Sequence, residues 1–96
     1  MYYLYVLQSL KDDKFYTGFT PNLKKRLGKH VRGEVKSTKN RLPVKLVYYE
    51  AYLLREDAVA REKYLKTSMG KRILKKQLKN FINLKKFDKI KISSIE

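Results

Sequence analysis

The chain has 96 residues, of which 43% are hydrophobic, so it can form one compact core but is too short for a catalytic domain with a separate targeting domain. It carries 24 Lys and Arg against 9 Asp and Glu, a formal net charge of +15, which favours a polyanionic partner: nucleic acid, an anionic membrane surface or a ribosomal location. It contains no cysteine, which excludes disulfides, cysteine zinc sites and thiol catalysis.

The N-terminal stretch from Met1 to Leu7 is apolar, but it is too short for a membrane span. It has no basic leader and continues into polar Gln8 and Ser9, unlike a secretory signal. We therefore expect a soluble, cytoplasmic protein that does not insert into a membrane.

Two segments near the N-terminus, residues 2–9 and 15–19, are rich in Tyr, Val, Leu and Phe, which is typical of strands. The polar residues between them predict a hairpin turn with a two-residue loop, Asp12 and Asp13. The chain therefore begins with two antiparallel strands.

A short amphipathic helix is predicted next. Thr20 before Pro21 resembles an N-cap followed by proline at the first helical position, and the helix should run to about Arg32 before Gly33 ends it. Residues 34–43 then carry Ser, Thr, Asn, basic residues and a proline, which predicts a basic loop.

A third strand is predicted from Val44 to Leu53. Apolar residues lie on both of its faces, so we expect it in the interior of the sheet, covered on both sides. The residues of one face are Leu46 and Tyr48, and those of the other are Val47, Tyr49 and Ala51.

A second helix is predicted over about residues 55–68, and Gly70 interrupts the helical pattern. A third helix then follows. Its inward residues are Ile73, Leu74, Leu78 and Phe81, and its outward ones are Lys71, Arg72, Lys75, Lys76 and Lys79. The segment 83–96 forms a basic C-terminal tail that is either a short strand or disordered.

These elements follow the order strand, strand, helix, strand, helix, helix. They predict an α+β domain over residues 1–82, with a small three-stranded antiparallel sheet flanked by three helices.

The hairpin supplies the first candidates for chemistry. With a two-residue loop, Tyr5 shares a sheet face with Tyr16 and Gly18. Two phenols then point in the same direction, and Gly18 leaves room above that face for a backbone or a ligand. Because tyrosine favours strands and the chain has eight of them, packing alone is the simpler explanation of this pair.

Arg26 and His30, the only histidine, lie one turn apart on the edge of the predicted first helix if Leu23 and Leu27 form its buried stripe. A guanidinium can grip a phosphate oxygen and an imidazole can move a proton, so both side chains suit a cleft. The alternatives are a structural histidine and an arginine that lies along the surface.

Glu62 lies inside an apolar stripe of the predicted second helix, where an apolar residue is expected. The other members of the stripe are Leu54, Ala58, Leu65 and Met69. An unpaired carboxylate there costs several kcal/mol, so Glu62 needs a cation. A lysine or arginine across the core and a bound metal ion fit the pattern equally well.

Together these residues resemble the GIY-YIG nuclease superfamily. Tyr3-Leu4-Tyr5 stands where the first triad of the family would be, and Tyr16-Thr17-Gly18 stands where the second would be. Arg26, His30 and Glu62 follow in the family's order. The resemblance covers about residues 1–81 and is strongest to small stand-alone bacterial members.

The resemblance implies an endonuclease that hydrolyses DNA phosphodiester bonds with one divalent ion, Mg²⁺ or Mn²⁺, in DNA repair or recombination. Glu62 would hold the ion at the scissile phosphate, Tyr5 would act as general base on water, and Tyr16 would orient that water. Arg26 would neutralise charge that develops on phosphorus, and His30 would hydrogen-bond the nucleophile or the phosphate.

Basic residues outside this set would bind flanking phosphates without reading the base sequence. We therefore expect the shape of the DNA, rather than its sequence, to direct cleavage. A partner protein is a further expected means of selecting the target. They are Lys24, Lys25, Lys29, Lys36, Lys39, Arg41, Lys71, Arg72 and Lys75. RNA is an alternative substrate. There are two rival functions: a non-catalytic nucleic-acid-binding module with the same fold, and a basic subunit of a repair or ribosomal assembly.

Overall fold

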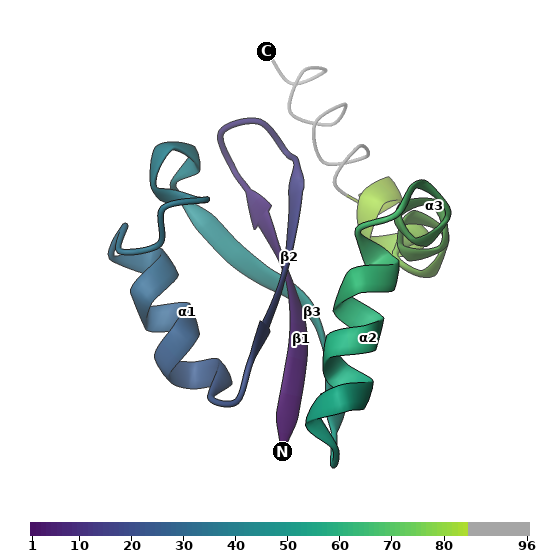
Figure 1. Cartoon of the computed structure of the whole chain (residues 1–96). Helices are drawn as coiled ribbons and strands as arrows, with labels where there is room; N and C mark the ends of the chain where they lie inside the picture. The colour runs from purple at the N-terminus through teal and green to yellow at the C-terminus, as the bar shows by residue number, and fades with distance from the viewer. Residues whose placement is uncertain (85–96) are drawn as a thin grey trace. The chain divides into compact units, whose positions relative to one another are not determined.

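The computed structural model describes residues 1–84, which fall into two compact units that meet between residues 64 and 65 of the chain. The first unit contains a three-stranded antiparallel sheet in the order β2-β1-β3 (Figure 1). The elements are β1 (Tyr2–Ser9), β2 (Phe15–Thr20), α1 (Leu23–Val31), the 3-10 helix η1 (Lys39–Arg41), β3 (Val44–Tyr52), α2 (Arg55–Leu65) and α3 (Ser68–Gln77). The predicted α+β class and element order are confirmed, with η1 as an addition.

The register of β1 and β2 places the predicted side chains on one face. Tyr5 is opposite Gly18 and Leu7 is opposite Tyr16. Because side chains alternate between the two faces of a strand, both tyrosines share the face that α1 covers. The predicted grouping of Tyr5, Tyr16 and Gly18 is confirmed.

The hairpin loop is longer than predicted. It comprises the five residues 10–14 rather than Asp12 and Asp13 alone. The backbone N–H of Ser9 donates to the carbonyl of Lys14 at 3.0 Å, and Asp13 has a φ of 60°. The last pair of the register, Gln8 and Phe15, encloses the six residues 9–14. Because six and two are both even numbers, the observed and the predicted turn place the same residues on the same face, so the wrong loop length left the predicted sheet faces correct.

The interior strand is β1, and the prediction that Val44 to Leu53 lies inside the sheet is wrong. β1 pairs with β2 on one side and with β3 on the other, and its residues Leu4, Val6 and Leu7 are buried. β3 is an edge strand that nevertheless carries apolar residues on both faces. The reason is that α1 covers one face of the sheet and residues 55–64 of α2 cover the other (Figure 1).

A β-bulge in β3 changes which residues share a face. Tyr48 is opposite Val6 but Leu46 is opposite Leu7, so Val47 is an extra residue between them. Leu46 therefore packs on the α1 side whereas Tyr48 points to the α2 side, and the predicted pairing of these two residues on one face is wrong. Strict alternation along the sequence could not reveal the extra residue.

The first helix begins at Asn22 and not at Thr20. The Asn22 side chain accepts a hydrogen bond from the backbone N–H of Lys25 at 3.1 Å, as an N-cap does. Thr20 is still in β2, and its hydroxyl accepts from the N–H of Asn22 at 3.1 Å, which fixes the turn. Gly33, with a φ of 76°, follows the helix as predicted.

The core between α1 and the sheet supports the site described below. Its buried members are Tyr5, Leu7 and Val44. Partly buried residues pack around them from both strands, from α1 and from the loop before β3, and these are Tyr16, Leu23, Leu27, Leu42 and Leu46. The predicted inward stripe of Leu23 and Leu27 is confirmed.

The break between the last two helices occurs before Gly70. α2 ends at Leu65, and the hydroxyl of Thr67 caps α3 by accepting from the N–H of Gly70 at 3.0 Å. Gly70 is therefore a buried residue inside α3 rather than a helix break. Residues 79–84 are again helical, and the predicted tail from residue 85 onward lies outside the described residues.

The apolar stripe predicted around Glu62 is only partly buried. Ala58 and Leu65 are buried, but Leu54 precedes α2, Met69 belongs to α3, and both are exposed. Ile73, predicted inward, is also exposed. Across residues 1–84 no helix has the length and hydropathy of a transmembrane segment.

Candidate active site

Tyr5, Arg26 and His30 form one hydrogen-bonded group. The Tyr5 hydroxyl lies 2.8 Å from Nε2 of His30, and Nε of Arg26 donates to the same hydroxyl at 3.3 Å. The rings of Tyr5 and His30 meet edge to face with centroids 5.5 Å apart, and both side chains are buried. The central strand and the helix α1 therefore bring a phenol, a guanidinium and an imidazole together.

Thr38 completes this group, and the sequence analysis did not identify it. Its hydroxyl lies 2.7 Å from Nδ1 of His30, and its residue is only 1% exposed. The backbone N–H of Thr38 donates to the carbonyl of Val35, which holds the hydroxyl in place just before η1. In the sequence Thr38 is one of several polar residues in a basic loop, so no local pattern distinguishes it.

The contacts of His30 fit a neutral ring in two arrangements. Nε of Arg26 can only donate, so the Tyr5 oxygen accepts from it, and this oxygen can also either donate its own proton to Nε2 of His30 or accept from Nε2. In the first arrangement Nδ1 carries the ring proton and donates to Thr38, and in the second Nδ1 accepts from Thr38. Burial lowers the pKa of His30, and the positive charge of Arg26 lowers it further. In the first arrangement the neutral His30 is an acceptor for the Tyr5 proton.

Gly18 determines where the Tyr5 ring lies. A Cβ at residue 18 would collide with Cζ and the hydroxyl of Tyr5 and would lie 2.9 Å from its Cε1. The ring therefore occupies the space that a side chain on the opposed strand would fill. The sequence predicted room above Gly18 for a backbone or a ligand, and the Tyr5 side chain fills that space instead.

The other two candidates are placed differently. Tyr16 is partly buried and packs against the cluster that contains Tyr5, so it joins the site by contact. Glu62 is partly buried on α2, the helix that covers the opposite face of the sheet. The hydrogen-bonded group consists of Tyr5, Arg26, His30 and Thr38, and Glu62 is not a member of it.

A partly buried ion pair lies on the α2 side, and its carboxylate is Glu50. Its side chain, 16% exposed, pairs with Arg61 of α2 at 3.1 Å, and the Arg61 side chain is 24% exposed. The hydroxyls of Tyr48 and Tyr52 also donate to Glu50. The sequence analysis missed this cluster, although a glutamate flanked at i−2 and i+2 by tyrosines in an apolar strand was its visible sign.

The ionisation of this cluster is set by burial and by its hydrogen bonds. Burial raises the pKa of Glu50, but donation from Tyr48, Tyr52 and Arg61 outweighs burial, and the net pKa is lowered. Burial, together with the Glu50 carboxylate, raises the pKa of both Tyr48 and Tyr52 to about 12. The cluster is therefore one anion, one cation and two neutral phenols at neutral pH.

Several basic residues of the first unit lie on the two segments that carry the site, α1 and the loop before η1. Lys24 and Lys25 on α1 are exposed, and so are Lys36 and Lys39 in the loop that carries Thr38. Arg41 pairs with Asp12 at 3.4 Å, and Lys29 is partly buried. The second unit exposes three of the predicted phosphate-binding residues on α3: Lys71, Arg72 and Lys75.

Residues 1–84 contain no cluster of three His, Cys, Asp or Glu side chains that could hold a metal ion. A metal that keeps most of its water and binds one protein carboxylate plus a substrate phosphate does not need such a cluster, and Mg²⁺ behaves in this way. A single oxygen ligand such as Glu62 fits that coordination.

With this geometry in view, residues 1–76 match the GIY-YIG catalytic domain, and the chain belongs to this family of nucleases. Within the family it is similar to proteins named UPF0213. One, from Clostridium perfringens (strain 13 / Type A), is 46% identical over 67 residues, which is 69% of this chain and 71% of the relative. Another, from Streptococcus pyogenes serotype M3, is 46% identical over 65 residues, 67% of this chain and 70% of the relative. No solved structure matches.

Proposed function

We propose that this protein is a metal-dependent endonuclease that hydrolyses DNA phosphodiester bonds at structural features of DNA, in repair or recombination. The observation that carries the proposal is the buried group in which Arg26 and His30 both contact the hydroxyl of Tyr5. A phenol between a fixed cation and a neutral imidazole is equipped for proton transfer. The net charge of +15 supports a polyanionic substrate.

Tyr5 is the proposed general base. As water attacks phosphorus, the Tyr5 oxygen takes a proton from the water, and the proton of the phenol moves to Nε2 of His30. His30 becomes protonated, and Thr38 keeps the ring oriented by accepting from Nδ1. Both ring nitrogens of His30 have protein partners, so this role replaces the direct phosphate contact expected from the sequence. Tyr16, on the same face, orients the water.

Arg26 is proposed to stabilise charge that develops on the phosphate. One of its N–H groups is committed to Tyr5, and the remaining N–H groups can bind phosphate oxygens. Such a preorganised cation beside the reacting group stabilises the transition state more than the ground state.

Glu62 is the proposed ligand of one Mg²⁺ or Mn²⁺, because a carboxylate oxygen is a hard ligand for a hard cation. Since α2 covers the sheet face opposite Tyr5 (Figure 1), this role requires the bound DNA, rather than a contact within the protein, to bring the ion and the Tyr5 group to one phosphate. When bound, the ion supplies stabilisation of the leaving oxygen. The exposed lysines of α1 and of the loop around Thr38 bind flanking phosphates without reading bases, which leaves target choice to DNA structure or to a partner protein.

The test is cleavage of flap, nicked, branched and intact duplex DNA, and of matched RNA, in Mg²⁺, Mn²⁺ or chelator. Tyr5→Phe and Glu62→Gln should each lower the cleavage rate by about 100-fold or more. Glu56→Gln, in the exposed first turn of α2, and Tyr2→Phe are the matched controls and should cleave normally. Normal cleavage by Glu62→Gln would remove Glu62 from the reaction. Tight DNA binding with no cleavage by the native protein would favour the non-catalytic binding module.

A further inference from the structure

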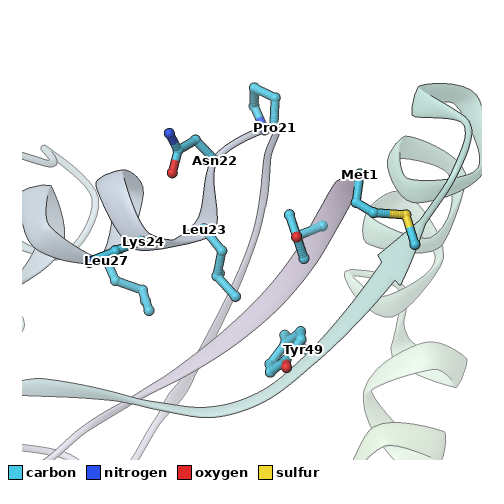
Figure 2. Close-up of a pocket in the computed structure, with 8 residues that line it drawn as sticks. Met1, Pro21, Asn22, Leu23, Lys24, Leu27 and Tyr49 are labelled. Atoms are coloured by element: carbon cyan, nitrogen blue, oxygen red, sulfur yellow. The ribbon is translucent and has the colours of Figure 1, made fainter.

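A pocket of about 460 Å³ lies beside the candidate active site. It opens between the first turns of α1 and the strands β1 and β3, with Leu23 and Leu27 on the helix side and Tyr49 on the strand side (Figure 2). Tyr3 and Lys24 also line it. All of these residues belong to the first unit of the chain.

The pocket lies next to the group around Tyr5. Tyr49 is the register partner of Tyr5 on β3, and Tyr3 precedes Tyr5 by two residues on the same face of β1. Two residues along a strand span about 7 Å. Leu23 and Leu27 pack against the core of the site and line the pocket as well. This spacing is short enough for the nucleotide next to a phosphate at Tyr5 to reach the pocket.

The lining has the chemistry that binds a nucleobase. The rings of Tyr3 and Tyr49 pack edge to face with centroids 6.1 Å apart, and Tyr49 is 52% exposed. An exposed aromatic face stacks on any base, and the leucines provide an apolar wall. Lys24, an exposed cation in the lining, can bind the phosphate of the same nucleotide.

We propose that this pocket takes an unpaired nucleobase of the DNA strand, next to the phosphate that lies at Tyr5. The inference rests on the proposed function and specifies its substrate class. In an intact duplex both faces of each base are covered by stacking, so only a base at a flap, gap or frayed junction can enter without the cost of extrusion. The pocket thus selects DNA with an unpaired nucleotide beside the cleavage position.

An apolar segment of another protein is the competing occupant. The net charge of +15, Lys24 in the lining and the position of Tyr49 opposite Tyr5 all favour a nucleotide over a peptide. The two occupants differ in one measurable respect, because a nucleobase site distinguishes normal from abasic DNA and a peptide site does not.

The first measurement is fluorescence of flap DNA that carries 2-aminopurine at successive positions from the junction, with native protein in chelator so that no cleavage occurs. We expect the fluorescence to change at one position only, next to the junction. Tyr49→Ala should abolish the change, and Tyr49→Phe, which keeps the ring, should retain it. Leu53→Ala, an exposed apolar residue just after β3, is the control and should behave as native.

The second measurement is affinity for the same flap with an abasic nucleotide at that position. The native protein should bind abasic DNA about 5- to 100-fold more weakly, and Tyr49→Ala should bind both DNAs equally. Equal native affinity for both, or a fluorescence change insensitive to Tyr49→Ala, overturns the inference. Neither readout needs cleavage, so the pocket and the proposed nuclease activity can fail separately. A fluorescence change at one position, in a protein that cleaves no DNA when Mg²⁺ or Mn²⁺ is added, supports the nucleobase pocket and counts against the nuclease activity. Cleavage without that fluorescence change supports the nuclease activity and counts against the pocket.

Discussion

Gly18 and Tyr5 depend on each other across the hairpin. The ring of Tyr5 is buried and fills the space where a Cβ at residue 18 would lie. Gly18→Ala is therefore expected to displace the ring and weaken the contacts of its hydroxyl with Arg26 and His30. We predict a loss of cleavage of about 100-fold, comparable to loss of a general base, with little change in DNA affinity.

Steady-state cleavage and equilibrium binding by Gly18→Ala measure the two effects separately. Gly28→Ala on α1 is a useful comparison, because the Cβ there meets only the end of the flexible Arg32 side chain, at 3.0 Å. Equal activity of Gly18→Ala and native protein would mean that the position of the Tyr5 ring is unimportant for the reaction.

Thr38 is predicted to set the tautomer of His30. Thr38→Val keeps the shape of the side chain but removes the acceptor for the Nδ1 proton, which leaves a buried donor without a partner at a cost of about 1 to 3 kcal/mol. Cleavage should fall, and Thr38→Ser, which retains the hydroxyl, should restore most of it.

His30 is the only histidine, so its ring nitrogens give unambiguous NMR signals. In native protein near neutral pH, the ¹⁵N shifts should show a proton on Nδ1, and Thr38→Val should redistribute that proton toward Nε2. An unchanged tautomer in Thr38→Val would contradict a positioning role for this hydroxyl, whatever the effect on stability.

The attachment of α2 to the sheet depends on the Glu50 cluster. Removing either member of a mostly buried ion pair leaves the other charge without compensation. Because both side chains keep some solvent contact, we expect Glu50→Gln and Arg61→Met each to lower the free energy of unfolding by about 2 kcal/mol. Since α2 also carries Glu62, we expect the cleavage rate to fall in both variants as this helix docks less firmly on the sheet.

A double-mutant cycle of Glu50→Gln and Arg61→Met, followed by denaturant unfolding, measures the coupling directly. The double variant should lose clearly less stability than the sum of the two single losses. Additive losses would show that Glu50 and Arg61 act independently, in which case packing of residues such as Ala58 would have to hold α2 in place.

The pH dependence of the whole domain should reflect His30. Its pKa in the folded protein is lower than the ordinary value of 6.5, so the unfolded state binds more protons between the two values. The stabilisation from the neutral ring is present above pH 6.5 and is lost as the pH falls toward the folded pKa. We predict a decrease in unfolding free energy below pH 6.5, together with a loss of cleavage, because a protonated His30 cannot accept from Tyr5.

Denaturant unfolding between pH 5 and 8 tests this prediction. His30→Gln serves as the reference, and its stability should vary less over the same range. A native protein as stable at pH 5 as at pH 7 would be inconsistent with a buried neutral histidine. The lowered pKa of Glu50 affects stability in a different pH range. The stabilisation from its ionised carboxylate is lost only as the pH falls below 4.5.

Much of the molecule was predictable because it depends on local pattern. Runs of strand-favouring Tyr, Val, Leu and Phe located the strands, and parity across the hairpin placed Tyr5, Tyr16 and Gly18 on one face. The sequence also identified Arg26 and His30 as neighbours on one edge of a helix, and their order with Glu62 resembled the correct family. These properties require only neighbours in the chain or a regular repeat.

Tertiary contacts decided the features that involve distant residues. The bulge at Val47 and the central position of β1 arise from strand pairing, which a periodic pattern does not encode. Thr38 gains its role only because the loop before η1 folds back onto α1. Glu50 of β3 meets Arg61 because α2 packs against the sheet, and no pattern within either segment shows that pairing. Which side chains meet across the core depends on how whole helices and strands pack. That packing depends on residues throughout the chain, so no local pattern reveals it.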